Sequence, residues 1–477
     1  MSIFNSQHSL FQHFEEIAKI PHGSYHEEKI ADYIEAIAKQ NHLKYERDVM
    51  NNIIIFKEAS EGFENHEPVI LQGHMDMVNE KNNDSDHDCD HDPLDLYIED
   101  GFLHARGTTL GADDGVAVCY MLSILTDKTL KHPPLECVFT VQEEVGLLGA
   151  AGLDVSSLRS KRMIGLDSGT EGETCTSSSG GRDLEIRKKI QFEKVKDSVY
   201  TIEVKGLLGG HSGSCIHMGR ANANKLIARI LYRLLLEKTD IHIVRIQGGL
   251  KDNAIPRECI VTFSSQKSYE NIEKVVKQCY REFLEEREIT DPDIQVLFYP
   301  DESDSCLSLK ESEEIIRFLY VAPNGCIEKS QMIKDLPILS LNMGVIKTEM
   351  NEMVVIYSIR SPLDSYRQDL HLQLQCLGET YHFTTEMSSD YPGWDYDPHS
   401  KMRQELSQCY KQYTGNLLLE VATHGGLETG ILKGKIPGLD IVTMGPNMSY
   451  IHTPDEMLDI DSYQRTYELL IHFLERL

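Results

Sequence analysis

The sequence predicts an α/β protein of two domains, with the second domain inserted into the first. Apolar runs of strand length alternate with helical patterns along most of the 477 residues, which is typical of this class. The apolar runs near both ends are nearly continuous, as in a sheet buried on both faces, whereas those in the middle alternate polar and apolar residues. Such alternation is typical of an antiparallel sheet covered by helices.

The first domain begins with four predicted strands and one helix with an apolar stripe. The helix is expected over residues 114–125, where apolar side chains recur at helical spacing. The strands are expected over residues 52–56, 68–72, 135–141 and 163–166.

The inserted domain is predicted in the middle of the chain. Nearly continuous apolar runs, like those near the N-terminus, return after residue 391. We place the domain limits at 1–182, 183–390 and 391–477. The middle strands are expected over 199–207, 241–249, 259–265, 337–346 and 353–360, with helices over 220–237, 270–286 and 365–381. Apolar runs at 417–426 and 438–446 and a helix over 461–477 complete the first domain.

Composition excludes several classes of protein. The chain has 47 basic and 76 acidic residues, a formal net charge of −29, which disfavours binding to nucleic acid or to anionic membranes. Its 11 cysteines include no CxxC pair, so neither a disulfide framework nor a thiolate zinc site is indicated. No secretory signal and no membrane-spanning apolar run is apparent, so we expect a cytoplasmic protein.

Carboxylates and histidines follow the predicted apolar strands. In open α/β sheets, ligands gather beyond the carboxyl ends of the strands, where the loops converge. Side chains of this kind occur at His74 and Asp76, at Glu143 and Glu144, at Asp167, at Asp113 and Asp114 before the helix, and at His452.

This mixture of side chains fits a pair of metal ions. Zinc accepts imidazole nitrogen and carboxylate oxygen, and two metals about 3.5–4 Å apart need a bridging carboxylate with further ligands on each metal. Glu143 would then stay free as a general base, and Asp76 would accept the other ring N–H of His74. The ligands would be His74, Asp113, Glu144, Asp167 and His452.

Each motif also has a simpler interpretation. The aspartate of HMD is typical of a turn, Asp113 or Asp114 would cap a helix, and the segment around His452 would be a turn before a helix. Because all of these features follow apolar runs, we favour a metal-dependent hydrolase.

A family resemblance supports this interpretation. The chain carries, in order, LQGHMDMV, RGTTLGADDGVAV, TVQEEVGLLGA, GLDSGTEGE, GGHSG, NAIPRE and HTPDE. These segments resemble the motifs of the cocatalytic-zinc aminopeptidase and aminoacylase superfamily. KNND, GRANANKLIAR, APNG, IRSPLDS and YPGW narrow the resemblance to the aminoacyl-histidine dipeptidases, also called peptidase D or Xaa-His dipeptidases. It covers essentially the whole chain and implies a mixed-sheet catalytic domain with an inserted α+β lid and dimerisation domain.

The resemblance implies a role for each motif residue. His74, Asp113 and Asp167 would hold one zinc, and Asp113, Glu144 and His452 would hold the other, with Asp113 as the bridge. Glu143 would be the general base and Asp76 would orient His74. Where the family commonly has Asp-Asn-Gly, this chain has Asp113-Asp114-Gly115, so an extra charge lies beside the bridging ligand.

The inserted domain would supply the residues that bind the substrate. By the resemblance, His211 stabilises the tetrahedral oxyanion, often from the other subunit of a dimer. Asn253 and Arg360 hold the substrate, with Arg360 at its carboxylate, and the glycine-rich turn of His424 and Gly426 lines the pocket. A surface ion pair is the simpler interpretation of Arg360.

The implied protein is a cytoplasmic homodimer with two Zn²⁺ per chain, for which Mn²⁺ or Co²⁺ could substitute. It would hydrolyse Xaa-His dipeptides such as β-alanyl-histidine after closure of the inserted domain. Two alternatives stay open: hydrolysis of other short peptides or N-acyl amino acids, and an inactive relative that only binds peptides.

Two further segments look functional but have plainer interpretations. The acidic segment 84–92 would need glycine at Cys89 and glutamate at Asp95 to be an EF-hand, so we predict a solvated acidic loop. The run SSSGG at residues 177–181 is predicted to be a turn or hinge rather than a phosphate cradle.

Overall fold

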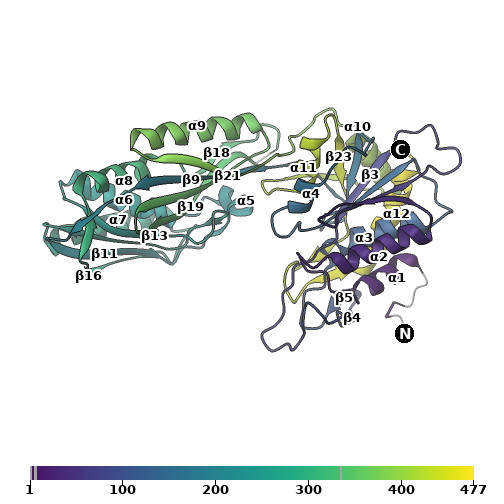
Figure 1. Ribbon diagram of the computed structural model, residues 1–477, viewed down its shortest axis with the longest axis horizontal. Coiled ribbons are helices and arrows are strands. Elements are labelled where there is room, and N and C mark those ends of the chain that lie inside the picture. The colour runs from purple at the N-terminus through teal and green to yellow at the C-terminus, as the bar shows by residue number, and fades with distance from the viewer. Residues whose placement is uncertain (1–2, 5–7, 334–335) are drawn as a thin grey trace. The chain divides into compact units, whose positions relative to one another are not determined.

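The computed structural model describes residues 3–4, 8–333 and 336–477, and the chain forms two compact units. Unit 1 comprises Met1–Ser177, Tyr396–Val421 and Leu427–Leu477; unit 2 comprises Ser178–Asp395 and Ala422–Gly426. In Figure 1, unit 1 accordingly contains both the purple N-terminal and the yellow C-terminal elements, and unit 2 is teal to green. The limits predicted at 182 and 390 fall within strands of the unit 2 sheet, so the observed limits lie several residues outside them.

A mixed six-stranded sheet is the framework of unit 1. β6, β3, β7 and β23 run parallel to one another, whereas β2 is antiparallel to both of its neighbours, β1 and β6. Every residue of β3 and β6 is buried, as their continuous apolar runs predict. The carboxyl ends of the parallel strands therefore share one edge. The spatial order is β1 (Lys44–Arg47), β2 (Ile53–Lys57), β6 (Leu135–Thr140), β3 (Val69–His74), β7 (Arg162–Gly165), β23 (Asp440–Thr443).

Helices cover this sheet, and α3 is the most deeply buried of them. α3 is apolar on all sides and packs against α1 and β3. The hydroxyl of its Tyr120 donates to the carbonyl oxygen of Tyr463 in α12 (2.8 Å), and the two rings stack. The helices are α1 (Ser9–Ile17), α2 (Glu28–Gln40), α3 (Ala112–Thr126), α4 (Leu148–Gly152), α10 (Lys401–Thr414), α11 (Glu428–Lys435) and α12 (Ile460–Leu474).

Two small sheets fix the loops of unit 1. An antiparallel sheet has the order β24 (Met448–Ser449), β25 (Met457–Asp459), β5 (Phe102–Ala105), β4 (Leu96–Glu99). Its β24–β25 pair holds the loop that contains His452. β8 (Glu173–Ser178) pairs with β22 (Leu419–Thr423).

An antiparallel nine-stranded sheet is the framework of unit 2, as the alternating pattern predicts. Two short pairs lie beside it: β10 (Phe192–Lys194) with β17 (Ser305–Leu307), and β12 (Gly210–His211) with β14 (Ala254–Ile255). The large sheet has the order β16 (Gln295–Asp301), β11 (Ser198–Lys205), β15 (Cys259–Ser265), β13 (His242–Gly248), β19 (Pro337–Thr348), β20 (Glu352–Ser361), β9 (Gly180–Lys189), β21 (Thr384–Tyr391), and β18 (Gly325–Lys329) pairs with β19.

Four amphipathic helices pack on the unit 2 sheet and complete its own hydrophobic core. Ser308 and Glu311 form a capping box at the start of α8, which satisfies backbone N–H groups that the helix itself leaves free. The helices are α6 (Ala223–Leu236), α7 (Tyr269–Arg287), α8 (Leu309–Val321) and α9 (Asp364–Thr380), with the short α5 (Ser212–Cys215) and the 3₁₀ turn η1 (Ile216–Met218).

At residues 177–181, where a turn or hinge was predicted, β8 ends at Ser178 and β9 begins at Gly180, and the limit between the two units lies between Ser177 and Ser178. The glycines are needed for close packing: a Cβ atom at Gly181 would lie 2.4 Å from the ring of Tyr391. No disulfide bond joins the cysteines of the described residues. Within the described residues, no helix has the length and apolar character required to span a bilayer.

Candidate functional site

His74 ends β3 and is almost completely buried. Its Nδ1 lies 2.9 Å from the main-chain oxygen of Asp76, and its Nε2 lies 3.1 Å from Oδ1 of Asp113. Because a carbonyl oxygen only accepts, Nδ1 carries the proton of the neutral ring and Nε2 is free to bind a metal. The sequence predicted the Asp76 carboxylate as the acceptor, but its Oδ1 is farther away, at 3.5 Å.

The carboxylate of Asp76 instead supports the loop after β6. It accepts hydrogen bonds from the Ser24 hydroxyl (2.8 Å) and from the main-chain N–H groups of Glu143 (3.1 Å) and Glu144 (3.3 Å). Asp76 therefore positions both glutamates, a function that the HMD spacing did not predict.

Asp113 lies between two histidines. Its Oδ1 faces Nε2 of His74 at 3.1 Å and its Oδ2 faces Nε2 of His452 at 3.3 Å. Nε2 of His452 also lies 2.7 Å from Oε1 of Glu144. A carboxylate with one oxygen directed at each histidine has the arrangement that a bridging ligand requires.

The remaining predicted ligand, Asp167, follows β7 and joins the same cluster. Ligand atoms of His74, Asp113 and Glu144 lie within 4.8 Å of one another, as do those of His74, Asp114 and Asp167. Asp114 is completely buried; its Oδ2 accepts from the main-chain N–H of His74 (3.2 Å), and its Oδ1 has no hydrogen-bond partner among the described residues.

The cluster strongly shifts the protonation of its members. Burial and the neighbouring carboxylate of Asp113 raise the pKa of Asp167 to about 7. Burial, together with the charges of Asp167, Glu428 and Glu144, raises the pKa of Glu143 well above its usual range. Hydrogen bonds to Asp113 and Glu144 raise the pKa of His452 to about 10.

The donor set fits divalent metal ions. In the described part of the chain, only histidines pair with the clustered carboxylates, and no lysine or arginine neutralises them. So much buried negative charge requires a cation. The donors are imidazole nitrogens and carboxylate oxygens without a thiolate, which suits zinc, manganese or cobalt.

A residue without a predicted role, Glu456, fixes the start of α3. Its carboxylate accepts from four successive main-chain N–H groups, those of Leu110, Gly111, Ala112 and Asp113, at 2.8–3.4 Å. The capping role considered for Asp113 and Asp114 is therefore wrong, since neither makes a side-chain cap bond. The sequence signal that could have predicted this role is the glutamate that ends the HTPDE motif.

The predicted substrate-binding residues gather in unit 2. His211 pairs with Ala254 across β12 and β14, and the N–H of Ser212 donates to the main-chain oxygen of Asn253 (2.7 Å). Nδ1 of His211 accepts from the N–H of Gly213 (3.1 Å), so its Nε2 carries the proton in the neutral ring. The Asn253 side chain itself is exposed.

Arg360 belongs to the same cluster, and the surface ion pair considered for it is wrong. Its side chain is buried; Nε donates to the Ser212 hydroxyl (3.2 Å) and Nη1 to the Tyr391 hydroxyl (3.1 Å). No carboxylate of the described residues pairs with it within 4.0 Å. A Cβ atom at Gly426 would lie 2.8 Å from the Tyr391 ring, so Tyr391, which sequence reasoning missed, connects Arg360 with the glycine-rich turn.

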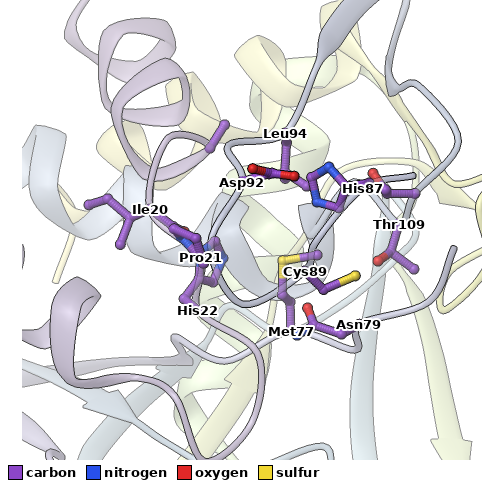
Figure 2. Close-up of a pocket in the computed structure, with 12 residues that line it drawn as sticks. Ile20, Pro21, His22, Met77, Asn79, His87, Cys89, Asp92, Leu94 and Thr109 are labelled. Carbon is purple, nitrogen blue, oxygen red and sulfur yellow. The ribbon is translucent and has the colours of Figure 1, made fainter. Parts of the chain in front are cut away.

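The acidic loop lies outside the metal cluster. Most of its side chains are exposed, while His87, Cys89 and Asp92 line a small pocket with His22 and Met77 (Figure 2). The pocket volume of about 10 Å³ is just enough for one water molecule and too small for a peptide.

Comparison with known proteins agrees with this geometry. Residues 70–476 match Peptidase family M20/M25/M40. The chain is 36% identical to the cytosol non-specific dipeptidase of Escherichia coli (strain K12), over 99% of this chain and 98% of that protein. The crystal structure of aminoacylhistidine dipeptidase from Vibrio alginolyticus matches with a TM-score of 0.91 and 35% identity, over 100% and 99% of the two chains.

More distant structures share the fold alone. Aminopeptidase PepT from Bacillus cereus matches with a TM-score of 0.58 at 16% identity, over 98% of each chain. Together with the strand order, these matches confirm the mixed-sheet fold class expected from the resemblance.

Proposed function

Because the chain belongs to peptidase family M20/M25/M40, a family of metallopeptidases, we propose that it is a two-metal dipeptidase acting on Xaa-His and related dipeptides such as β-alanyl-histidine. The substrate class follows its two full-length relatives, one named a non-specific dipeptidase and the other an aminoacylhistidine dipeptidase. The observation that carries the proposal is Asp113, with one oxygen toward each of two histidines and Glu143 nearby.

The proposed ligand sets are those that the family resemblance implies. His74, Asp113 and Asp167 would hold one ion, and Asp113, Glu144 and His452 would hold the other; the proximity of His74, Asp113 and Glu144 supports them. Zinc is the proposed metal, with manganese or cobalt as substitutes, because all three accept this donor set. When bound, the pair supplies Lewis-acid activation of water and of the scissile carbonyl.

Glu143 moves the proton. Its carboxylate takes a proton from the attacking water and passes it to the nitrogen of the leaving amino acid. Burial and neighbouring carboxylates raise the pKa of Glu143 well above its usual range, which favours retention of that proton until the amine needs it. The two hydrogen bonds from the Glu143 and Glu144 N–H groups to Asp76 keep the base beside the ligand.

The unit 2 cluster binds and orients the substrate. Arg360, which pairs with no carboxylate of the described residues, holds the terminal carboxylate of the dipeptide, where a guanidinium makes charge-assisted hydrogen bonds. His211 donates from Nε2 to the oxygen that becomes negative in the transition state. Asn253 contacts the substrate through its exposed amide, and Gly426 leaves room beside Tyr391.

Three further properties stay predictions: a cytoplasmic location, a homodimer, and a role for the inserted domain as lid and dimerisation domain. The name of the Escherichia coli relative supports the first, and the family resemblance supports the others. Sedimentation of the purified protein tests the dimer.

The deciding experiment measures hydrolysis of β-alanyl-histidine and other Xaa-His dipeptides, with and without a chelator, and bound metal on the same sample. We expect cleavage that disappears on chelation and returns with zinc, at about two metals per chain. Two metals with cleavage of N-acyl amino acids or longer peptides alone would contradict the dipeptidase proposal. Failure of the zinc-restored protein to bind metal or cleave any of these compounds would instead favour an inactive peptide-binding protein.

A further inference from the structure

A pocket in unit 2 collects basic side chains in a strongly acidic protein. It has a volume of about 360 Å³ and is lined at one end of α6 and α7 by Arg220, Lys225, Arg287, His217, Asn222 and Asn324, and none of its lining residues is aspartate or glutamate. In a chain with 76 acidic and 47 basic residues, such a lining is not expected from composition.

The cations of this pocket lack carboxylate partners among the described residues. Arg229 and Arg233, on the same helix as Lys225, pair with Glu282 and Glu286 of α7. By contrast, no carboxylate in the described residues lies within ion-pair distance of Arg220, Lys225 or Arg287. The nearby buried Asp291 is occupied by the main-chain N–H groups of Leu208 and Ala221.

Two of the cations keep hydrogen-bond donors for a ligand. Nη1 of Arg220 donates to the oxygen of Gly209 (2.6 Å), and Nη1 of Arg287 donates to the oxygen of Gly219 (2.9 Å). Nε of Arg287 is buried without a partner among the described residues. Because a guanidinium has five N–H donors, most donors of both arginines have no partner within the described part of the chain.

Lys225 contributes charge rather than donors. Its ammonium donates to the carbonyl oxygens at the end of α8, those of Leu319 (2.7 Å), Tyr320 (2.9 Å) and Ala322 (2.6 Å). The ammonium is thereby fixed at the pocket wall, where it attracts an anion without contacting it directly.

We propose that this pocket binds a small organic anion through a phosphate or carboxylate group, with Arg220 and Arg287 as its principal partners. Guanidinium groups suit both anions because they form paired, charge-assisted hydrogen bonds. The volume lies in the range of small-molecule sites, and Ile216, Leu226 and Ile255 provide apolar lining for the rest of the ligand. The site is independent of the proposed peptidase activity.

The ligand should also restrain the neighbouring segment. Arg220 holds Gly209, next to the strand β12 that contains His211, and a Cβ atom at Gly210 would lie 2.7 Å from Nη1 of Arg220. An anion that fixes Arg220 therefore protects main-chain N–H groups of residues 209–221 from hydrogen exchange.

The test is calorimetric binding of glycerol 3-phosphate, glycerate and glycerol to the metal-loaded protein. We expect at least one of the anions to bind and neutral glycerol not to bind; the two anions separate a phosphate site from a carboxylate site. Arg287→Gln should weaken binding by at least about tenfold, as loss of one charge-assisted contact does. Arg281→Gln, which changes an exposed arginine of the same helix outside the pocket, should leave binding unchanged.

Hydrogen exchange of the unsubstituted protein gives a second, variant-free result. Protection at residues 209–221 on addition of the anion supports the proposal. The proposal would be overturned if neither anion binds or if the two variants bind equally well. It would also be overturned if protection is confined to the residues of the metal cluster, because an anion can also bind a metal.

Discussion

Several residues of the proposed metal cluster are held by partners that belong to other segments. Asp76 holds the two glutamates, Asp113 separates two histidines, and Glu456 holds the turn that contains Asp113. Metal ligation, proton transfer and positioning are thus carried by different side chains, so substitutions should separate them.

Substitution of the proposed base should remove catalysis without removing metal. Glu143→Ala should lower kcat by about 10²–10⁴-fold, the usual contribution of a general base, while both metals stay bound. The check is steady-state hydrolysis together with metal analysis, and Glu58→Gln, an exposed glutamate of the same unit, is the control. Undiminished turnover would remove Glu143 from the mechanism.

Substitution of the proposed bridging ligand, Asp113, should instead remove metal. Asp113→Ala should reduce the metal content of the purified protein, because both ions lose a ligand. Asp84→Asn, in the exposed acidic loop, should keep the full content, since that loop lies outside the cluster. Equal metal content in the two variants would contradict the bridging role.

The sequence predicted the members of the site better than their contacts. Strand ends locate His74, Glu143 and Asp167, because parallel strands bring their carboxyl ends to one edge. The contacts of Asp76 and Tyr391 depend on which atoms meet across 67 and 31 residues of sequence, and spacing within a motif does not contain that information.

At the scale of elements, the loop from β24 to β25 and the N-terminus of α3 form one positioning device. Glu456 occupies the helix end with four hydrogen bonds, where a negative charge also interacts favourably with the helix dipole. The same loop carries His452, so the histidine and Asp113 are positioned by one contact.

Loss of the Glu456 charge should therefore weaken both stability and metal binding. Glu456→Gln should destabilise unit 1 by about 1–3 kcal/mol, because an amide directs N–H groups at buried donors and leaves them unsatisfied. The apparent metal affinity should fall with it. Calorimetric melting and a competitive chelator measure the two effects.

The control is Glu28→Gln, an exposed glutamate in the first turn of α2, for which we expect at most about 1 kcal/mol and unchanged metal affinity. A Glu456 variant that binds metal normally would show that the helix end does not position Asp113.

The long buried elements were predictable, and the elements with mixed composition were not. The strand over 259–265 was predicted at its observed limits because its apolar run is bounded by polar residues. β21 (Thr384–Tyr391), with its mostly exposed side chains, was missed because an edge strand is defined by its partner β9 rather than by its own apolar pattern.

At the scale of the whole molecule, we expect the stability of the folded protein to depend on bound metal, because the chain is already strongly acidic. Without metal, burial raises the pKa values of Asp167 and Glu428 to about 7. Below its unfolded-state pKa of about 4, such a carboxyl group is protonated in both the folded and the unfolded state, so it does not lower the free energy of unfolding. As the pH rises to the folded pKa, the unfolded state binds fewer protons than the folded state, so the free energy of unfolding falls.

We therefore expect the melting temperature of the chelated protein to fall between pH 5 and about pH 8, where both carboxyls ionise in the folded state. The metal-loaded protein should change less, since bound cations compensate the charge of the ligand Asp167. The difference in melting temperature between the loaded and chelated forms should thus grow with pH.

Glu428→Gln separates this effect from general repulsion within a chain of net charge −29. Glu428 lies beneath the cluster and accepts from Gln72 and Thr140, each at 2.6 Å, and glutamine retains an acceptor oxygen there without a titrating charge. The chelated variant should therefore lose less stability than the chelated parent between pH 5 and pH 8. If the variant and the parent lose the same amount, the pH dependence comes from the surface charge and not from the buried carboxyl groups.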